Sequence, residues 1–426
     1  MFNPLNLLII LPTPASMPPA QAGPAQQRTF QADEVRVENW LAERQFTDRR
    51  RSAFGGICAH QTPSAIGKAN GRRYFRVSPY VDDLGVIGLL RSRAPFRLTE
   101  SARWIAWYFG HLTPASAPDG VPYEHFYLRD GSGETVTPVP GDPRLDRYND
   151  ATDSAAATFL SLLRDYLRAG GAPSHLLSPG RRQKLDALAD TLLRLQDTDG
   201  LFWAKTTYRV KYLEDNCEVY NGLTALAELE RSLYRNTRRA ENAQHAASKL
   251  KRAVLRDLRD PAGGWYVAKL ENGAALKAKT QRWFPDMQCQ LWPVLYGIVS
   301  PASPEAAATR SALRNRWQGA TSALTDWTRD VGRFNNGFIN ADVAFGALLI
   351  GDRNAVATYL ESVRKLKFPD RPSSTDFEWP FTPLDAGWLL RIYARLRPRD
   401  QANRDYPASG RGPVSAATLV SAPSCD

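Results

Sequence analysis

The sequence predicts an all-α fold in which six inner helices form a ring and six outer helices surround it. Three observations support this prediction. Apolar residues recur at helical spacing over nearly the whole stretch from residue 33 to residue 397. The predicted helices alternate between two kinds of composition, and the loops between them alternate between short and long. An inner and an outer helix repeated six times make a toroid of six helical hairpins.

Apolar periodicity and stop signals place the twelve helices. The predicted ranges are 33–46, 79–91, 99–112, 150–168, 179–196, 213–233, 239–258, 284–299, 304–329, 336–350, 353–367 and 382–397. Short β-like pieces, such as Glu124–Leu128 and a pair within Gly263–Gly273, interrupt them. We therefore expect β-hairpin insertions in the loops.

Helix composition separates the two rings. The even-numbered helices are rich in Ala, Gly, Leu and aromatic residues, as in Asp342–Gly351 and Asp385–Leu396. The odd-numbered helices carry more charge, as in Ala246–Asp260. A helix that is apolar nearly all round is buried, and one with a charged face lies on the surface. The alternation predicts that the even-numbered helices are the inner ones.

The loops predict where the functional site lies. Connections from an inner helix to the next outer helix are short, as at Gly351-Asp352 and 300–303. Most connections back to an inner helix are long: 47–78, 113–149, 197–212, 259–283 and 368–381. Long loops in a compact domain usually serve function. In this architecture they all fall on the face where the inner helices begin.

Composition excludes several classes of function. The chain has 426 residues, 43% hydrophobic content and a net charge of +11, which is spread along its length. It has no basic block with interleaved aromatics, no zinc-finger spacing and no Walker loop, so we expect no nucleic-acid partner. No apolar run reaches the roughly 18 residues of a membrane span. Four cysteines without a CxxC pair and five histidines without an HExxH motif predict neither a metal nor a cofactor. We expect a monomer.

The chain divides into one large domain and two tails. Residues 1–30 contain the apolar run Leu5–Leu11 and an A-x-A pattern at Ala20-Gln21-Ala22, without the positive segment of a secretory signal. We expect this segment to be a weak signal peptide or disordered, so secreted or periplasmic and cytoplasmic locations both stay open. Residues 31–398 form the catalytic-type domain, and 399–426 a disordered tail.

Carboxylates gather at the predicted starts of the inner helices. An aspartate at a helix start can simply cap free N–H groups and favour the positive end of the dipole. The pairs Asp82-Asp83 and Asp150 with Asp153, however, supply more acids than there are caps. Cleavage of a glycosidic bond needs one acid to protonate the leaving oxygen and one carboxylate to activate water. The catalytic candidates are Asp82, Asp83, Asp153, Asp215, Glu218 and Asp286.

Aromatic and basic residues occur in the same long loops. Flat rings stack on sugars, although each ring is equally well explained as an anchor for its loop. The substrate-binding candidates are Trp203, Tyr208, Arg209, Tyr220, Trp283, Asp342 and Trp379. If the basic residues line the cleft they favour an anionic glycan, and if they point outward they are solvated surface. They are Arg72, Arg73, Arg76, Lys205, Arg209, Lys211, Lys269, Lys277, Lys279 and Arg282.

These features resemble the (α/α)6 barrel of the six-hairpin glycosidase superfamily. The stretch "DATDSAAATFLSLL" (Asp150–Leu163) is similar to the start of an inner helix in glycoside hydrolase family 8 and related bacterial families. That resemblance implies that Asp153 contacts the sugar at the cleavage point. "SPYVDDLGVIGLL" (Ser78–Leu90) resembles the segment that carries the general acid, a glutamate in that family, where this chain has Asp82 and Asp83.

Three functions remain in competition. The leading interpretation is a glycoside hydrolase that acts on a polysaccharide or oligosaccharide. The second is a polysaccharide lyase on the same toroid, which would draw on Arg209, Asn216, Tyr220 and Asn221. The third is a non-catalytic glycan-binding accessory protein. A lyase leaves an unsaturated, ultraviolet-absorbing product, whereas a hydrolase does not.

Overall fold

The computed structural model describes residues 24–59, 68–69, 72–112, 120–128, 131–136, 151–279, 283–316, 340–365 and 381–397. Its inner ring consists of α2 (Pro79–Arg91), α4 (Thr152–Arg168), α6 (Leu213–Ser232), α8 (Trp292–Leu295), α11 (Ala341–Leu349) and α13 (Pro383–Leu396). The outer helices are α1 (Pro24–Ala42), α3 (Arg97–His111), α5 (Pro179–Arg194), α7 (Thr237–Asp257), α9 (Pro304–Arg316) and α12 (Arg353–Lys365).

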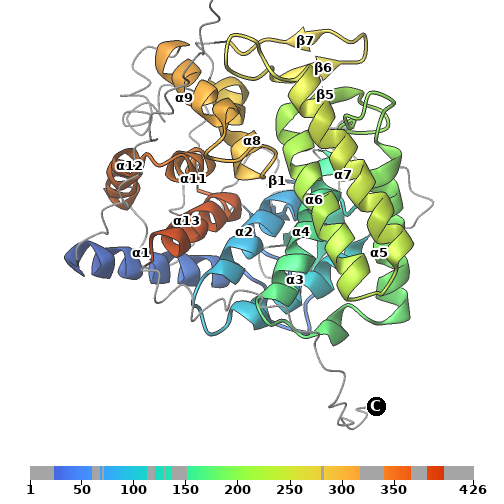
Figure 1. The fold of residues 1–426 in the computed structure, drawn as a ribbon. Coiled ribbons are helices and arrows are strands. Elements are labelled where there is room, and N and C mark those ends of the chain that lie inside the picture. Colours follow the sequence, from blue (N-terminus) through green and yellow to red (C-terminus); the bar gives the residue numbers. More distant parts are fainter. Residues whose placement is uncertain are drawn as a thin grey trace, which may run out of the picture.

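The inner helices close a ring. Each contacts the next one along the chain, and α13 returns to pack against α2 (Figure 1). Burial follows the predicted alternation: residues Thr152 to Leu163 of α4 are all buried, whereas α7 buries only a stripe of mostly alanines. The predicted all-α toroid of six hairpins is therefore confirmed.

Small residues allow the inner helices to approach closely. A Cβ atom added at Gly222 of α6 would lie 2.5 Å from the Ala157 Cα of α4. A Cβ atom at Gly88 of α2 would lie 2.2 Å from the Gly387 carbonyl oxygen of α13. Real Cβ atoms do not come this close, so these positions can hold only glycine without moving the helices apart.

Two predicted helices differ from the structure. The first begins at Pro24 rather than at residue 33, so residues 24–30 of the predicted disordered segment are helical. Phe30 explains part of this extension, because its ring packs 6.3 Å from that of Tyr393 in α13. The helix predicted at 284–299 is a succession of short turns, a π turn at Trp283–Met287, a 3-10 turn at Gln288–Leu291 and then α8. Pro285 and Pro293 lack the N–H that a continuous helix needs.

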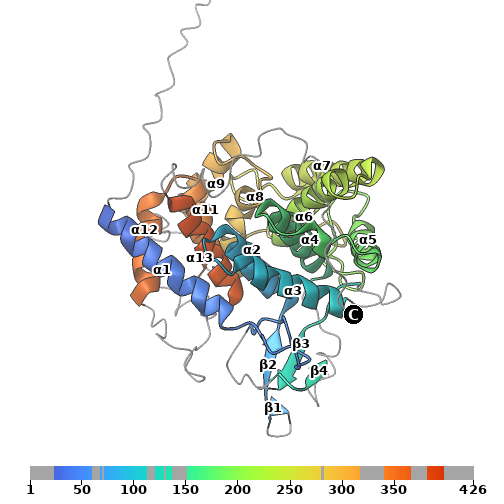
Figure 2. The same cartoon turned by 90° about the horizontal axis from the view of Figure 1, so that it is seen from below.

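Two small sheets occupy the long loops, as predicted. The first is antiparallel in the order β1 (Lys68–Ala69), β2 (Arg72–Val77), β3 (His125–Leu128) and β4 (Glu134–Val136), and it projects from the helices in Figure 2. The second contains β5 (Val210–Tyr212), β6 (Ala268–Leu270) and β7 (Ala275–Leu276). Strand β2 leads directly into α2 and β5 into α6, so each sheet fixes the start of an inner helix.

The predictions for residues 1–23 and 398–426 lie outside the described residues. Within the described ranges, no helix combines the length and apolarity that crossing a membrane requires. The same residues contain no group of three or more His, Cys, Asp or Glu side chains suited to a metal ion.

Candidate active site

A cavity of about 300 Å³ opens at the N-terminal ends of the inner helices, the face that the long loops predict. We call it the central pocket. It is lined by Arg76, Ser78, Tyr80, Val81, Glu124, Ala151, Ser154, Glu214, Asp215, Gln288, Trp292, Asn340, Asp342, Thr382, Leu384 and Asp385. Every inner helix or the turn before it contributes, so the ring itself builds the pocket.

A second, larger cavity of about 970 Å³ adjoins the first, and we call it the outer groove. The two share Ala151, Glu214 and Asp215. The outer groove continues along the β5–β7 sheet, where Tyr208, Tyr212, Lys277 and Lys279 line it with Asp286. A smaller pocket joined to a larger groove can hold one unit of a molecule in the pocket and the remainder in the groove.

The paired acids Glu214 and Asp215 stand at the junction of the two cavities. They lie in the first turn of α6, and both side chains are partly exposed. Strand β5 ends immediately before this turn and pairs with β6, which holds the helix start in place. Both carboxylates can therefore reach a bond that spans pocket and groove.

Asp385 lies at the start of α13, which is opposite α6 in the six-helix ring. Its Oδ2 atom accepts hydrogen bonds from the Thr382 backbone N–H at 3.0 Å and the Thr382 hydroxyl at 2.8 Å, in a capping box. Its Oδ1 atom accepts no hydrogen bond from the described part of the chain. Burial raises the pKa of Asp385 to about 7. One oxygen is thus fixed while the other stays available.

Asp342, predicted as a substrate-binding residue, also lines the central pocket. Its Oδ2 atom accepts hydrogen bonds from Gln288 Nε2 at 2.8 Å and Trp292 Nε1 at 2.9 Å. Burial raises the pKa of its carboxyl group. Asn340, the residue before α11, adopts a left-handed φ of 52°, which turns the chain into the helix at this point.

Glu218 and Asp153 lie beneath the pocket and are 1% and 0% exposed. Glu218 Oε1 accepts hydrogen bonds from the hydroxyls of Tyr80 at 3.1 Å and Tyr296 at 2.9 Å. Burial raises the pKa of Glu218 to about 8. Burial and the neighbouring Asp215 also raise the pKa of Asp153. Neither side chain is among those that line the pocket.

Asp82 and Asp83 are both fully buried in α2 and do not line the pocket. Asp82 Oδ2 accepts the Ser78 backbone N–H at 3.0 Å, the capping role expected of an acid at this position. Asp83 points into the core, where Trp104 Nε1 donates to it at 2.8 Å and the Thr158 hydroxyl at 3.1 Å. Two adjacent acids thus face different sides of one helix.

Glu124 also lines the pocket, although it is not among the candidate residues predicted from the sequence. It forms an ion pair with Arg76 and accepts a hydrogen bond from the Ser78 hydroxyl at 2.8 Å. The pairing of β2 with β3 brings these residues together from positions 48 apart in the sequence. The only signal in the sequence was its place at the start of the β-like piece Glu124–Leu128, within the long loop 113–149.

Comparisons with known proteins identify the fold. No protein-family model matches the sequence, and no curated protein matches it. Among solved structures, a wild-type glycosidase superposes with a TM-score of 0.57 at 16% identity, over 90% of this chain and 99% of that one. A glutamate-to-alanine variant of a glycosidase in complex with glucose gives a TM-score of 0.58 at 15% identity, over 91% of this chain and 99% of that one. Cellobiose 2-epimerase from Spirochaeta thermophila DSM 6192 gives a TM-score of 0.50 at 11% identity, over 88% of this chain and 98% of that one.

The fold is that of the six-hairpin glycosidases. The resemblance predicted from the sequence is confirmed at this level, whereas the specific likeness to glycoside hydrolase family 8 stays a prediction. The six-hairpin fold explains why acids from several inner helices meet, because the starts of the inner helices surround one pocket.

The other predicted binding residues spread over the loops of this six-hairpin fold. Tyr208 is 49% exposed in the outer groove, and its hydroxyl lies 2.8 Å from that of Tyr212. Arg209 is exposed and pairs with Glu271 at 3.1 Å. Tyr220 is half-buried and faces Lys251. The Trp283 side chain and the whole of Trp379 lie outside the described residues.

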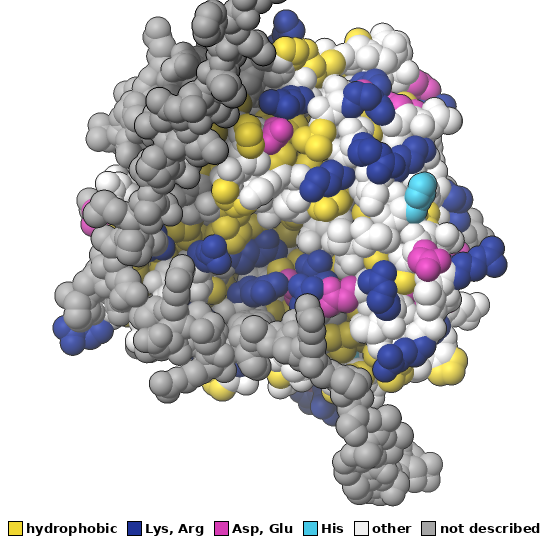
Figure 3. Space-filling view, in the orientation of Figure 1, with side chains coloured by type: hydrophobic (Ala, Val, Ile, Leu, Met, Phe, Trp, Pro, Cys, Tyr) yellow, Lys and Arg dark blue, Asp and Glu magenta, His cyan; other side chains and the backbone are white. Residues whose placement is uncertain are grey.

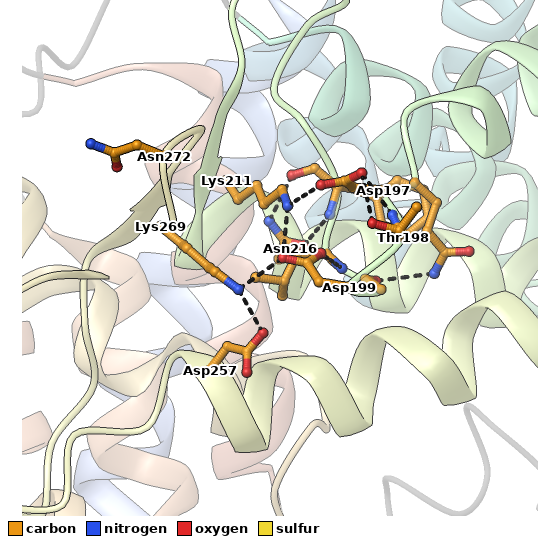
Figure 4. Close-up of polar contacts among 12 residues, drawn as sticks. Asp197, Thr198, Asp199, Lys211, Asn216, Asp257, Lys269 and Asn272 are labelled. Atoms are coloured by element: carbon orange, nitrogen blue, oxygen red, sulfur yellow. Dashed lines mark hydrogen bonds and ion pairs between the residues drawn. The ribbon is translucent and has the colours of Figure 1, made fainter. Parts of the chain in front are cut away.

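Two of the basic loop residues, Lys211 and Lys269, bind aspartates of the loops around them. Figure 4 shows Lys211 and Lys269 among three aspartates. Lys211 Nζ lies 2.5 Å from Asp197 and 2.7 Å from Asp199, and Lys269 Nζ lies 2.9 Å from both Asp199 and Asp257. The ring of Trp203 packs against Lys211, with its centroid 3.9 Å from Nζ. Trp203 therefore anchors the loop and is not among the residues that line either cavity.

Proposed function

We propose that this protein is a glycoside hydrolase that holds a sugar in the central pocket and releases a leaving group into the outer groove. The observation that carries the proposal is the placement of carboxylates. Glu214 and Asp215 stand where pocket meets groove, and Asp385 enters the pocket from the helix opposite. Two acids on opposite sides of a bond are what glycosidic hydrolysis uses.

In this mechanism the junction acids and Asp385 have different roles. The glycosidic oxygen lies at the junction, so Glu214 or Asp215 donates the proton to it. Asp385 takes a proton from water with its available oxygen, while Thr382 holds the other oxygen and fixes the carboxylate. The oxygen of the deprotonated water attacks the anomeric carbon as the bond to the leaving group breaks.

Charge favours an uncharged sugar in the central pocket. Its lining acids are Glu124, Glu214, Asp215, Asp342 and Asp385, and Arg76 is its only lining cation among the described residues. Arg76 is already paired with Glu124. An anionic sugar would therefore meet repulsion in the pocket. Any negative charge on the substrate belongs in the outer groove, where Lys277 and Lys279 lie.

The test is a screen of neutral and acidic oligosaccharides, read by new reducing ends and by ultraviolet absorbance of unsaturated products. We expect reducing ends without unsaturated product. Among Glu214→Gln, Asp215→Asn and Asp385→Asn, the donor variant and Asp385→Asn should each lose about 1,000-fold or more in kcat. Asp190→Asn, an exposed aspartate of α5 paired with Arg239, is the matched control. Full activity of all three variants would refute the proposal.

The pH dependence gives a second prediction. Because burial raises the pKa of Asp385 to about 7, its base form is lost as pH falls through this value. We expect kcat/KM to rise with pH on an acidic limb near pH 7. A limb near pH 4, where an ordinary aspartate ionises, would contradict the role of Asp385.

The two other functions have less support. The residues available to a lyase do not meet in the central pocket: Asn216 is buried and bonded to the backbone of Phe202, and Asn221 bonds to Arg164 and Ser161. Saturable glycan binding without turnover by the wild-type protein would favour the binding function instead.

A further inference from the structure

A third cavity, of about 620 Å³, lies at the opposite end of the ring, where the inner helices end. We call it the far-end pocket. Its walls include Arg91 of α2, Arg164 of α4, Asn221 of α6, Leu295 of α8, Leu349 of α11 and Arg391 of α13. All inner helices contribute to it, yet it shares no lining residue with the central pocket.

The far-end pocket has an excess of positive charge. Arg91 and Arg164 share a single carboxylate, that of Asp165, at 2.7 Å and 3.0 Å. Arg391 and Arg395 line the same cavity, and Asp165 is its only lining acid among the described residues. Figure 3 shows Lys and Arg side chains gathered around a hollow with hydrophobic side chains, over α2 and α13.

Arg391 is the most unusual member of this group. Its guanidinium carbon lies 4.0 Å from the centre of the Trp388 ring, and the guanidinium makes no hydrogen bond or ion pair with the described residues. The pKa of Arg391 is lowered to about 10, mainly by burial; Arg91 and Arg164 contribute to the lowering, and Tyr296 and Asp165 oppose it. A desolvated cation beside other cations is unfavourable unless an anion joins it.

Stabilisation of the helix ends does not explain the cluster. A basic residue in the last turn balances the partial negative charge of a helix C-terminus, which accounts for Arg91 at the end of α2. Arg164 lies about one turn before the end of α4, and it donates to Asp165 and Asn221 rather than to backbone carbonyls. Arg391 lies further still from the end of α13.

We infer that the far-end pocket binds a small molecule carrying a phosphate monoester. Planar guanidinium groups donate paired hydrogen bonds that match phosphate oxygens, and Arg91, Arg164 and Arg391 converge from three helices. Ile87, Phe345 and Leu349 supply an apolar wall for the rest of the molecule. The cavity is larger than a phosphate ion, so the ester group adds contacts that inorganic phosphate lacks.

Calorimetric titration of the full-length protein with inorganic phosphate and with glucose 6-phosphate, at ionic strength fixed with chloride, tests this inference. We expect saturable binding of both, with the ester tighter. Arg391→Met keeps the packing on Trp388 and should weaken binding about 10- to 100-fold. Arg395→Met changes an exposed side chain, so it should fold normally and weaken binding several-fold.

Arg252→Met, on the exposed face of α7, is the control and should bind like the wild type. The inference fails if the wild type shows no saturable binding, or if the Arg391 and Arg252 variants bind equally. Binding to phosphatidic acid vesicles but not to glucose 6-phosphate would also overturn it, because the ligand would then be a lipid. These measurements need no glycosidase activity, so they stand apart from the function proposed for the central pocket.

Discussion

Glu218 is a buried acid whose environment keeps it protonated at neutral pH. Two tyrosine hydroxyls donate to one of its oxygens, and no positively charged side chain in the described part of the chain is bonded to it. Burial raises its pKa from 4.5 to about 8. In the unfolded chain the same carboxyl ionises near its ordinary pKa. Between these two values the folded protein holds a proton that the unfolded chain has released.

The free energy of unfolding should therefore fall as pH rises from about 4.5 to 8, and Glu218→Gln should reduce this dependence. The glutamine oxygen still accepts from Tyr80 and Tyr296, so the change removes mainly the ionisation. Linkage gives a contribution on the order of 5 kcal/mol across the window. Melting temperatures measured between pH 5 and 9 test it. Glu228→Gln, a half-exposed glutamate of the same helix, should leave the wild-type slope intact.

The sequence could place the acids at the inner-helix starts but not the side to which each one points. Asp82 and Asp83 differ by one position, which turns a side chain by about 100° around a helix. One caps the helix start and the other enters the core beside Trp104. Glu124 could not be connected to Arg76 at all, because strand pairing over 48 positions joins them. The start of a helix depends on residues that are close in the sequence. The register of paired strands and the rotation of a helix about its axis depend on contacts with distant parts of the chain.

At the scale of elements, the β5–β6 pair depends on the cluster of lysines and aspartates below it. Lys211 is 2% exposed and bonds to Asp197 and Asp199. Although burial raises the pKa of Asp199, its bonds to Lys211 and Lys269 outweigh this effect and hold its pKa below the ordinary value. The lysines thus replace like-charge repulsion in this loop by attraction.

Lys211→Met should destabilise the protein by about 2–3 kcal/mol, because Asp197 then loses its lysine partner and Asp199 keeps only Lys269. The loss is smaller than for a fully buried pair, since the two aspartates remain partly exposed. Urea unfolding measures it, and the loss should diminish in Lys211→Met/Asp197→Asn. Lys251→Met is the matched control, because among the described residues this lysine interacts only with the Tyr220 ring, 5.7 Å from its Nζ. Equal stability of the two lysine variants would contradict this account.

The boundaries of helices could be predicted from the sequence wherever the helical spacing of apolar residues continued without interruption. Helices α2 and α5 begin at their predicted residues, because Ser-Pro pairs mark both starts. The fourth inner segment was predicted as one helix because its apolar residues keep a helical spacing. Pro285 and Pro293 break its hydrogen bonds, and neighbouring inner helices supply the contacts that keep the turns in the ring.

At the scale of the whole molecule, the ring depends on the contact between its first and last inner helices. Helices α2 and α13 are far apart in the chain but meet with almost no side chain between them. The alternating composition predicted two rings, and the run Ala155 to Ala157 predicted close packing of α4, which contacts α6 at Gly222. The order of the inner helices around the ring could be predicted only from the repeated alternation of inner and outer helices. The closing contact itself could not be identified, because no pattern within α13 points to α2.

Gly387→Ala should therefore separate α13 from α2 and destabilise the entire protein. A Cβ atom at this position would lie 2.1 Å from the Leu84 carbonyl oxygen and 2.9 Å from the Gly85 Cα. Backbone atoms cannot rotate away as a flexible side chain can, so the helices must shift, and we expect a loss of about 3 kcal/mol or more. Gly110→Ala in α3 is the matched control. No atom outside that helix lies within 4 Å of its added Cβ, so the change should be neutral or stabilise by about 0.5–1 kcal/mol. Urea unfolding of the two variants compares them directly, and a Gly387→Ala protein as stable as the wild type would mean that the ring does not close through this contact.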